Sequence, residues 1–139
     1  MVLVGFAVGF RLHGTALQGM EAFLLLIVFA FAFEWLFLWL GMISGNPQAA
    51  QGMGLLVVPW VFISSAFVPV ESMPGWLQAI AKYQPVTFMV NAVRTLTQGR
   101  AAEVVLGHPA SYYVTRSLLW SVVLVAVFAP LAVARFRRG

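Results

Sequence analysis

The stretch EAFLLLIVFAFAFEWLFLWLGM, residues 21–42, decides which kind of protein this chain can be. A helix of about 20 apolar residues is long enough to cross the roughly 30 Å hydrocarbon core of a bilayer. Glu34 is the only ionisable residue in the interior of the stretch, and Gly41 and Gly45 mark the end of the helix. The sequence therefore predicts a membrane-spanning helix over residues 18–43.

The composition of the whole chain supports this interpretation. Of its 139 residues, 62% are hydrophobic and 9% are charged, whereas a soluble domain has roughly 25% charged residues. The formal net charge is +4, but the arginines lie at the ends of apolar runs rather than among stacking aromatic residues, which argues against nucleic acid as a partner. Because there is no cysteine, disulfides and thiolate metal sites are excluded.

The apolar segment in front of this span is too short to cross a bilayer. MVLVGFAVGF, residues 1–10, covers about half of the hydrocarbon core. It lacks the basic start and the small-residue cleavage site of a signal peptide. We expect residues 1–10 to be the end of a truncated span.

A second span follows a tight turn. In SGNPQ, residues 44–48, Asn46 can accept hydrogen bonds from the first free amides of a new helix, and Pro47 suits its first turn. We predict a span over residues 47–69, antiparallel to the first.

Pro59 lies inside the predicted second span, where its missing amide and its ring should bend the helix. The carbonyl that loses its donor needs a partner in a bilayer, and Ser64, Ser65 or a neighbouring helix can supply one. Pro59 is either a structural kink or a gating hinge.

The stretch FVPVESMPGWLQAIAKYQPVT, residues 67–87, is too polar to cross a membrane. After Pro74, the apolar Trp76 and Ile80 fall on one helical face, and Lys82 falls on another. This pattern predicts a short amphipathic helix at the membrane surface.

A second short helix is predicted from Pro85 to a stop at Gly99. It carries a polar stripe that would not face lipid, made of Thr87, Asn91, Arg94 and Gln98. If this helix crossed the bilayer, an arginine at midspan would cost about 2.5 to 3.5 kcal/mol. We therefore predict a re-entrant or interfacial helix pair over residues 74–99, with both ends on one side of the membrane.

The last span is predicted over residues 110–134 and is followed by a basic tail, residues 135–139. Tyrosines and a tryptophan mark the start of the span, as is typical of membrane interfaces. The number of basic residues between the second and last spans is close to the number in the tail, so a simple count does not decide the orientation. The arginines of the tail lie directly against a span, where the positive-inside rule is strongest, so we expect a cytoplasmic C-terminus.

No arrangement typical of an enzyme is present. The phosphate-binding pattern GxxxxGK[ST] does not occur, so we expect no ATP hydrolysis by this chain alone. His13 and His108 lack a second ligand at helical spacing, and each of the four glutamates lies in a different segment. We expect no catalytic residue, no metal site and no cofactor bound by this chain.

Glu34 is the ionisable residue that most needs an explanation. A carboxylate at midspan is costly unless it is neutral, paired or exposed to a wet cavity. It either contacts a cationic substrate in a translocation path, or it is protonated and hydrogen-bonded to a neighbouring group. Both interpretations stay open.

The order of these motifs resembles the membrane subunit of type-two ABC exporters, and most of all the daunorubicin-resistance group of multidrug permeases. The similarity rests on NPQAAQG, SSAFVPVESMPGWLQ, QPVT and NAVR, followed by a last span with a basic tail. It covers nearly the whole chain. The resemblance implies an all-α integral membrane protein that holds the end of span three and spans four to six. The expected fold is a single transmembrane domain over residues 1–139, with three full transmembrane helices, a partial N-terminal one, and a re-entrant helix pair before the last span.

The resemblance also implies a function. We expect a multi-pass permease subunit in the cell membrane that moves a drug-like or amphiphilic compound outward. It would form a homodimer in the lipid bilayer, and a separate ABC ATPase subunit would bind ATP and magnesium on the cytoplasmic side. The coupling region between spans two and three is not in this sequence. The expected substrate path includes Glu34, Asn91 and Arg94, although the resemblance assigns no role to Glu34; the expected outer gate includes Pro69, Pro74, Trp76 and Pro85.

The competing hypothesis is a small non-transporting membrane assembly protein or an inactive permease fragment. A lipid-modifying enzyme is disfavoured because the chain lacks a histidine or acidic cluster.

Overall fold

The computed structural model describes residues 15–137 of the chain, and every regular element within them is a helix. The all-α class predicted from the sequence is thereby confirmed for the described residues. The predicted end of a truncated span, residues 1–10, lies outside them, as does the last part of the basic tail.

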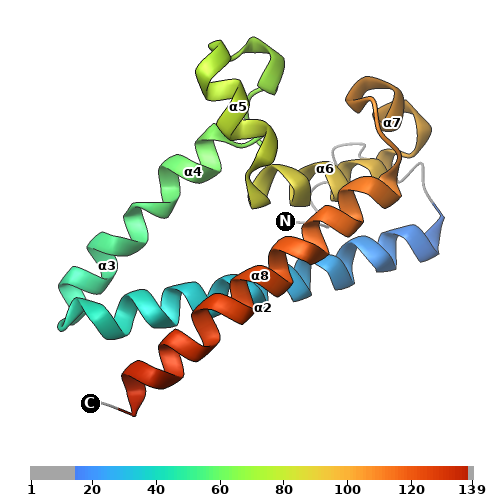
Figure 1. Cartoon of the computed structure of the whole chain (residues 1–139). Coiled ribbons are helices and arrows are strands. Elements are labelled where there is room, and N and C mark those ends of the chain that lie inside the picture. Colours follow the sequence, from blue (N-terminus) through green and yellow to red (C-terminus); the bar gives the residue numbers. More distant parts are fainter. Residues whose placement is uncertain (1–14, 138–139) are drawn as a thin grey trace, which may run out of the picture.

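Two helices are long and apolar enough to cross a membrane. α2 is Ala16–Ser44, with 29 residues, and α8 is Ala110–Phe136, with 27 residues. At about 1.5 Å per residue, each is roughly 40 Å long, which exceeds the roughly 30 Å of a hydrocarbon core. The two helices pack side by side and run in the same direction (Figure 1).

Residues next to α2 determine where it starts and stops. Thr15 Oγ1 accepts a hydrogen bond from the Gln18 amide at 3.3 Å, and Gln18 Oε1 accepts one from the Thr15 amide at 2.9 Å. This capping box starts the helix at Ala16, slightly before the predicted position. At the other end, Gly45 has a φ of 74°, a left-handed conformation that glycine adopts without strain.

The next helix, α3, is Pro47–Leu55. Asn46 Oδ1 accepts a hydrogen bond from the Ala49 amide at 2.7 Å, which caps the new helix. Pro47 is the first helical residue, where its missing N–H costs nothing. The turn therefore forms as its sequence indicates.

The predicted second span is divided into two helices, of which α3 is the first. After Leu56, the chain continues as α4, Val57–Ile63. Pro59 explains the break, because it has no hydrogen to offer the Leu55 carbonyl and its ring crowds that carbonyl. α4 ends well before the predicted end of the span, at Ser64, whose hydroxyl bonds to the backbone of the preceding turn.

Short helices connect α4 to α8. They are η1 (Val70–Ser72), α5 (Gly75–Tyr83), α6 (Pro85–Gln98) and α7 (Arg100–Leu106). α5 and α6 occupy the region of the predicted helix pair. α7 was not predicted as a separate helix; it lies between Gly99 and Gly107, which both have positive φ.

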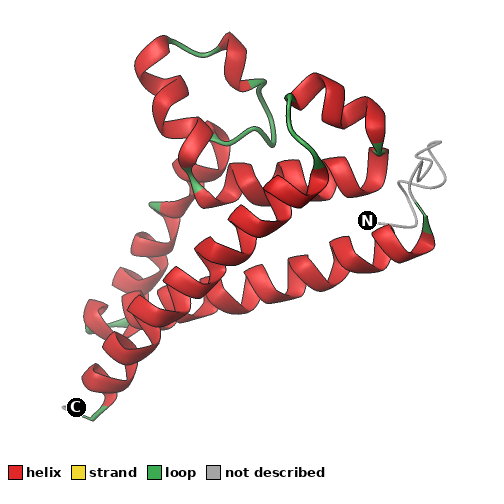
Figure 2. Ribbon diagram, turned by 45° about the vertical axis from the view of Figure 1, so that its right-hand side comes forward, coloured by secondary structure: helices red, strands yellow, loops and turns green. Residues whose placement is uncertain are grey.

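α6 is at the centre of the packing. It contacts both α2 and α8, and α2 and α8 contact each other (Figure 2). The buried apolar residues shared by these helices are Leu25, Phe29, Phe88, Met89, Ala92 and Tyr113. Those of α2 and α8 lie in the first half of each helix, so α6 covers only that half.

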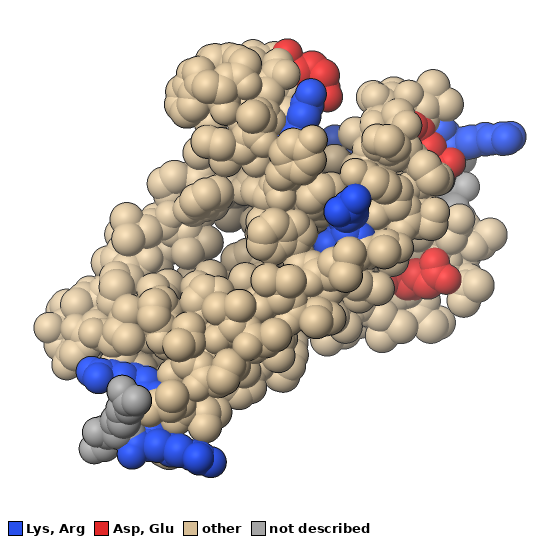
Figure 3. Space-filling view, viewed as in Figure 1, with Lys and Arg blue, Asp and Glu red and all other residues tan. Residues whose placement is uncertain are grey.

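The two ends of the molecule differ. The turn between α2 and α3 and the last residues of α8 lie together at one end, which we call the basic end (Figure 1). Arg135 and Arg137 are exposed there. In the visible face of Figure 3, the remaining charged side chains lie over the opposite half, and uncharged residues cover the rest. Large apolar side chains such as Phe23 and Val122 are more than half exposed, as expected for surfaces that meet lipid or another helix.

Candidate functional site

A cluster of buried polar groups joins the segment after α4 to α6. We call Ser65, Thr87, Asn91 and Arg94 the polar junction. The Ser65 hydroxyl donates to Asn91 Oδ1 at 2.9 Å, and the Ser65 amide donates to Thr87 Oγ1 at 3.3 Å. Arg94 Nη2 donates to the Ser65 carbonyl at 3.2 Å. Three residues of the predicted polar stripe, Thr87, Asn91 and Arg94, therefore face protein and bind Ser65, which is no longer in a helix. The fourth, Gln98, is exposed.

The polar junction brings two of the predicted path residues together. Asn91 is buried and Arg94 is half-buried, and both bind Ser65. Glu34, the third predicted path residue, is exposed on α2 and lines a shallow pocket formed by its own helix. A role for Glu34 in substrate contact stays a prediction.

The residues predicted for the gate all lie at helix boundaries or on the surface. Pro69 precedes η1, Pro74 precedes α5, and Pro85 is the first residue of α6. Trp76 is 70% exposed on α5. An amphipathic helix at an interface presents an aromatic side chain in this way. Their role as a gate stays a prediction.

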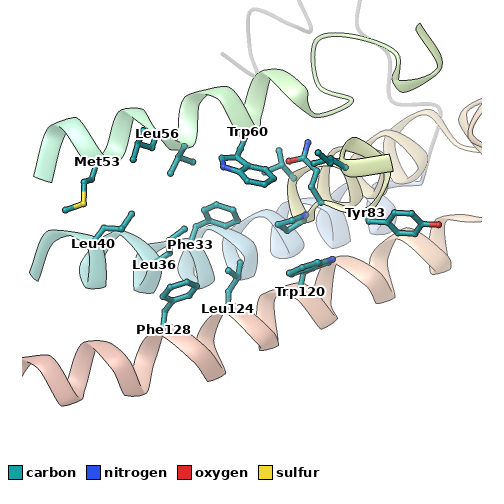
Figure 4. A pocket seen from close by; sticks show the side chains of 15 residues that line it. Phe33, Leu36, Leu40, Met53, Leu56, Trp60, Tyr83, Trp120, Leu124 and Phe128 are labelled. Carbon is teal, nitrogen blue, oxygen red and sulfur yellow. The ribbon is translucent and has the colours of Figure 1, made fainter. Parts of the chain in front are cut away.

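An apolar cavity of about 580 Å³ lies between α2, α3 and α4, α8 and the junction of α5 with α6 (Figure 4). This volume is typical of sites that hold one small molecule. The side chains that line it are Phe33, Leu36, Leu40, Met53, Leu56, Val57, Trp60, Ile80, Tyr83, Gln84, Pro85, Val86, Trp120, Leu124 and Phe128. None of them is charged. Sequence reasoning missed this cavity because its walls come from segments far apart in the chain.

Gln84 is the exceptional residue in this lining. It lies between α5 and α6 and is 4% exposed. Neither Oε1 nor Nε2 of its side chain has a hydrogen-bond partner in the described part of the chain. The sequence places Gln84 at the point where the two predicted short helices meet, but nothing in the sequence indicates that it is buried.

A second pocket, of about 290 Å³, has a mixed polar and aromatic lining near the start of α8. His108 stacks on Tyr112 with ring centroids 4.3 Å apart, and the Arg116 guanidinium carbon lies 5.4 Å from the centroid of the same tyrosine ring. Glu71 and Lys82 also line the pocket. Tyr83 lines both this pocket and the apolar cavity, so the two hollows adjoin at the end of α5.

Two serines lie on the buried face of α8, and one of them, Ser117, contacts α6. Ser117 and Ser121 are buried and four residues apart, so they lie on one face of the helix. The Ser117 hydroxyl lies 3.3 Å from the Met89 sulfur, and the Ser121 hydroxyl donates to the Ser117 carbonyl at 3.0 Å. Small residues at this spacing let helices approach closely in lipid. That spacing is the signal by which the contact could have been predicted.

Comparison with known proteins identifies relatives. A family model described as ABC-2 type transporter matches residues 1–97. The chain is 38% identical over 137 residues to the daunorubicin resistance ABC transporter permease protein DrrB1 of Streptomyces coeruleorubidus, which covers 98% of this chain and 46% of the relative. It is 24% identical over 140 residues to the probable doxorubicin resistance ABC transporter permease protein DrrC of Mycobacterium tuberculosis (strain ATCC 25618 / H37Rv), with 100% of this chain and 48% of the relative covered.

The chain thus spans about half the length of the curated relatives it matches. No solved structure matches it.

Proposed function

Because the chain belongs to the ABC-2 type transporter family, we propose that it acts as the membrane-spanning permease part of an ABC exporter. It would move a drug-like or amphiphilic compound out of the cell. The observation that carries this proposal is the apolar cavity of about 580 Å³ between the helices, whose lining is uncharged and rich in aromatic residues. Such a cavity suits the apolar body of an amphiphile.

The proposed topology has three spans: α2, the α3–α4 segment and α8. Pro47–Ile63 is an apolar helical segment of 17 residues. It would be roughly 25 Å long, somewhat less than a hydrocarbon core, so a locally thinner bilayer or the residues after Ile63 must complete the crossing. α5 and α6 would form the re-entrant pair. The packing of α6 against only the first halves of α2 and α8 supports that assignment.

The basic end would be cytoplasmic. Its exposed Arg135 and Arg137 lie directly after α8, and the positive-inside rule places such residues on the cytoplasmic side. The turn at Gly45 lies at the same end, so it would also face the cytoplasm (Figure 1). The segment from η1 to α7 would then lie on the outer side.

Energy would come from a separate ABC ATPase subunit that binds ATP and magnesium. The absence of a phosphate-binding loop from the sequence supports that division of labour. The permease would be a homodimer in the bilayer, and the exposed apolar side chains of α2 and α8 offer surface for a second copy or for lipid.

Gating would occur at the outer side. Pro69, Pro74, Trp76 and Pro85 are the proposed gate residues, since they bound or anchor the short helices that lie between α4 and α8. The proposed substrate path includes Asn91 and Arg94 of the polar junction, and Glu34 on α2.

Deletion and complementation of the gene test the proposed function. Cells that lack the gene are expected to accumulate more daunorubicin, the drug in the name of one relative, and to regain low accumulation when the gene and its ATPase are supplied together. Fluorescence of the cell-associated drug measures this. The matched control is the same ATPase with its phosphate-binding lysine replaced by alanine, which should abolish recovery.

The export hypothesis fails if drug accumulation is the same with and without the gene while the protein is present in the membrane. A stable complex that contains no ATPase would instead favour a non-transporting assembly protein.

A further inference from the structure

Gln84 has a side-chain amide whose donor and acceptor are both unused. Its Oε1 and Nε2 are buried without a partner in the described residues, and the whole side chain is 4% exposed. Buried polar atoms without a hydrogen bond are rare in native proteins, so each one requires an explanation. A group that enters the cavity lined by Gln84 would supply the missing partner.

Local structure does not use the Gln84 side chain. Its backbone carbonyl accepts from the Phe88 amide at 3.4 Å at the start of α6, but the side chain forms no cap. Gln78, on the preceding helix α5, shows the contrast: its Nε2 donates to the Met73 carbonyl at 3.0 Å and to the Glu71 carbonyl at 3.1 Å. The fold therefore pairs one glutamine of this region with backbone and leaves the other directed to the cavity.

The rest of the cavity lining defines what else the ligand must be. The lining holds no charged side chain, so an ion inside it would lose its hydration without gaining a partner. Aromatic rings from α2, α4, α5 and α8 surround the space: Phe33, Trp60, Tyr83, Trp120 and Phe128. Such rings favour a flat apolar body (Figure 4).

From these observations, we infer that the cavity is a binding site for one amphiphile whose buried part is flat, apolar and uncharged and carries a hydroxyl, carbonyl or amide that hydrogen-bonds to Gln84. Any charged part of the compound lies outside the cavity. The occupant has two possible sources: a compound on its way out of the cell, or an uncharged lipid of the bilayer. The inference deepens the proposed function and rests on it only for the first of these sources.

Binding to the purified chain in detergent micelles tests the site without any ATPase. The probes are 1-pyrenemethanol and 1-methylpyrene, which share the flat ring system and differ in the hydroxyl. Energy transfer to pyrene from the tryptophans of the cavity, Trp60 and Trp120, reports binding. Dissolution of the probes in micelles does not depend on the residue at position 84, so it cancels between variants.

The wild-type chain is expected to bind 1-pyrenemethanol more tightly than 1-methylpyrene. In Gln84→Met, the affinity for 1-pyrenemethanol should fall about two- to tenfold, the effect of one net hydrogen bond, with little change for 1-methylpyrene. The matched control is Gln51→Met, the same change at an exposed glutamine of α3 outside the cavity lining. Equal affinities of the two probes, or an unchanged preference in Gln84→Met, overturn the inference.

A second pair of variants tests the cavity independently of Gln84. Leu55 and Leu56 are neighbours with exposed fractions of 68% and 67%, but only Leu56 lines the cavity. Leu56→Trp should weaken binding of both probes by filling space, whereas Leu55→Trp should leave binding unchanged. Equal effects of the two substitutions contradict the site.

Mass spectrometry distinguishes the two sources of ligand. Bilayer lipid is the occupant if an uncharged lipid copurifies with the wild-type chain, is lost in Leu56→Trp and is displaced by 1-pyrenemethanol. Competition by daunorubicin with no such lipid identifies an exported compound.

The site and the proposed function fail separately. If the probe binds through Gln84 but no gene-dependent efflux is found, the binding site is supported and the export function is rejected. If efflux depends on the gene but Gln84→Met does not change probe binding, the binding site is rejected and the export function is supported.

Discussion

The position of Arg94 shows how a single charged residue is tolerated in a chain with few charges. Its guanidinium donates to the Ser65 carbonyl, which lies just beyond the end of α4 and has no helical donor. The cation thus pairs with a backbone group that would otherwise be unsatisfied in an apolar environment. Asn91 and Thr87 hold the same residue through its hydroxyl and its amide.

Removal of Asn91 from the polar junction should destabilise the protein. Asn91→Leu leaves the buried Ser65 hydroxyl without its acceptor, and we expect a loss of about 1 to 3 kcal/mol in the free energy of unfolding. Unfolding of the purified protein in detergent measures this. Gln98→Leu, at an exposed position of the same helix, is the control and should change stability little.

The double variant Ser65→Ala/Asn91→Leu extends that experiment. Because the two side chains share one hydrogen bond, the double variant should lose less stability than the sum of the single variants. Strict additivity would show that the contact between Ser65 and Asn91 contributes nothing.

Among the helices, the break between α3 and α4 has a local cause. Pro59 removes the donor to the Leu55 carbonyl, and the helix is interrupted at Leu56. The interruption places the exposed Leu56 at the edge of the apolar cavity, next to Val57. The α3–α4 segment therefore shapes the cavity whether or not this segment moves.

We expect Pro59 to be a structural kink rather than a hinge. Pro59→Ala restores a donor for the Leu55 carbonyl and should raise thermal stability, while gene-dependent efflux is retained. Pro130→Ala, the same change within the uninterrupted α8, is the comparison. A clear loss of efflux in Pro59→Ala at unchanged protein level would assign Pro59 to gating instead.

For the whole molecule, the direction in which α2 and α8 run determines how the chain between them must cross the membrane. α2 and α8 run in the same direction, so the chain between them must return to the end from which α2 starts (Figure 1). α3 and α4 make that return, and the segment from η1 to α7 then lies at one end of the molecule (Figure 2). This path requires an odd number of crossings between the end of α2 and the start of α8, which agrees with the proposed single crossing by α3 and α4.

Cysteine labelling tests this topology directly, since the chain has no cysteine of its own. Ser72→Cys and Ser111→Cys, at exposed positions on both sides of the short helices, should both react with an impermeant maleimide from the outer face of intact cells. Gln48→Cys and Arg137→Cys, at exposed positions of the basic end, should react only after permeabilisation.

Labelling of Ser72→Cys and Ser111→Cys from opposite faces would mean that residues 74–99 cross the membrane, and the re-entrant assignment would be wrong.

Much of the helix pattern could be predicted because its causes are local. Hydrophobic length indicates α2 and α8, and Asn46, Pro47 and Pro85 act on neighbouring backbone groups to start helices. The end of the second apolar segment could not be predicted. Serines are tolerated within membrane-spanning helices, so Ser64 and Ser65 did not indicate an end of the span. Only their bonds to α6 and to the preceding turn show why the helix stops there.

The sequence by itself determined that the chain is a helical membrane protein, because apolar length, proline and glycine act through the solvent and through adjacent residues. Only the tertiary structure decided that Thr87, Asn91 and Arg94 of α6 meet Ser65. It also decided that Glu34 lies apart from them and that Gln84 has no hydrogen-bond partner within the described residues in the cavity it lines. The reason is that hydrogen bonding and enclosure depend on groups from distant segments, whose distances no local pattern specifies.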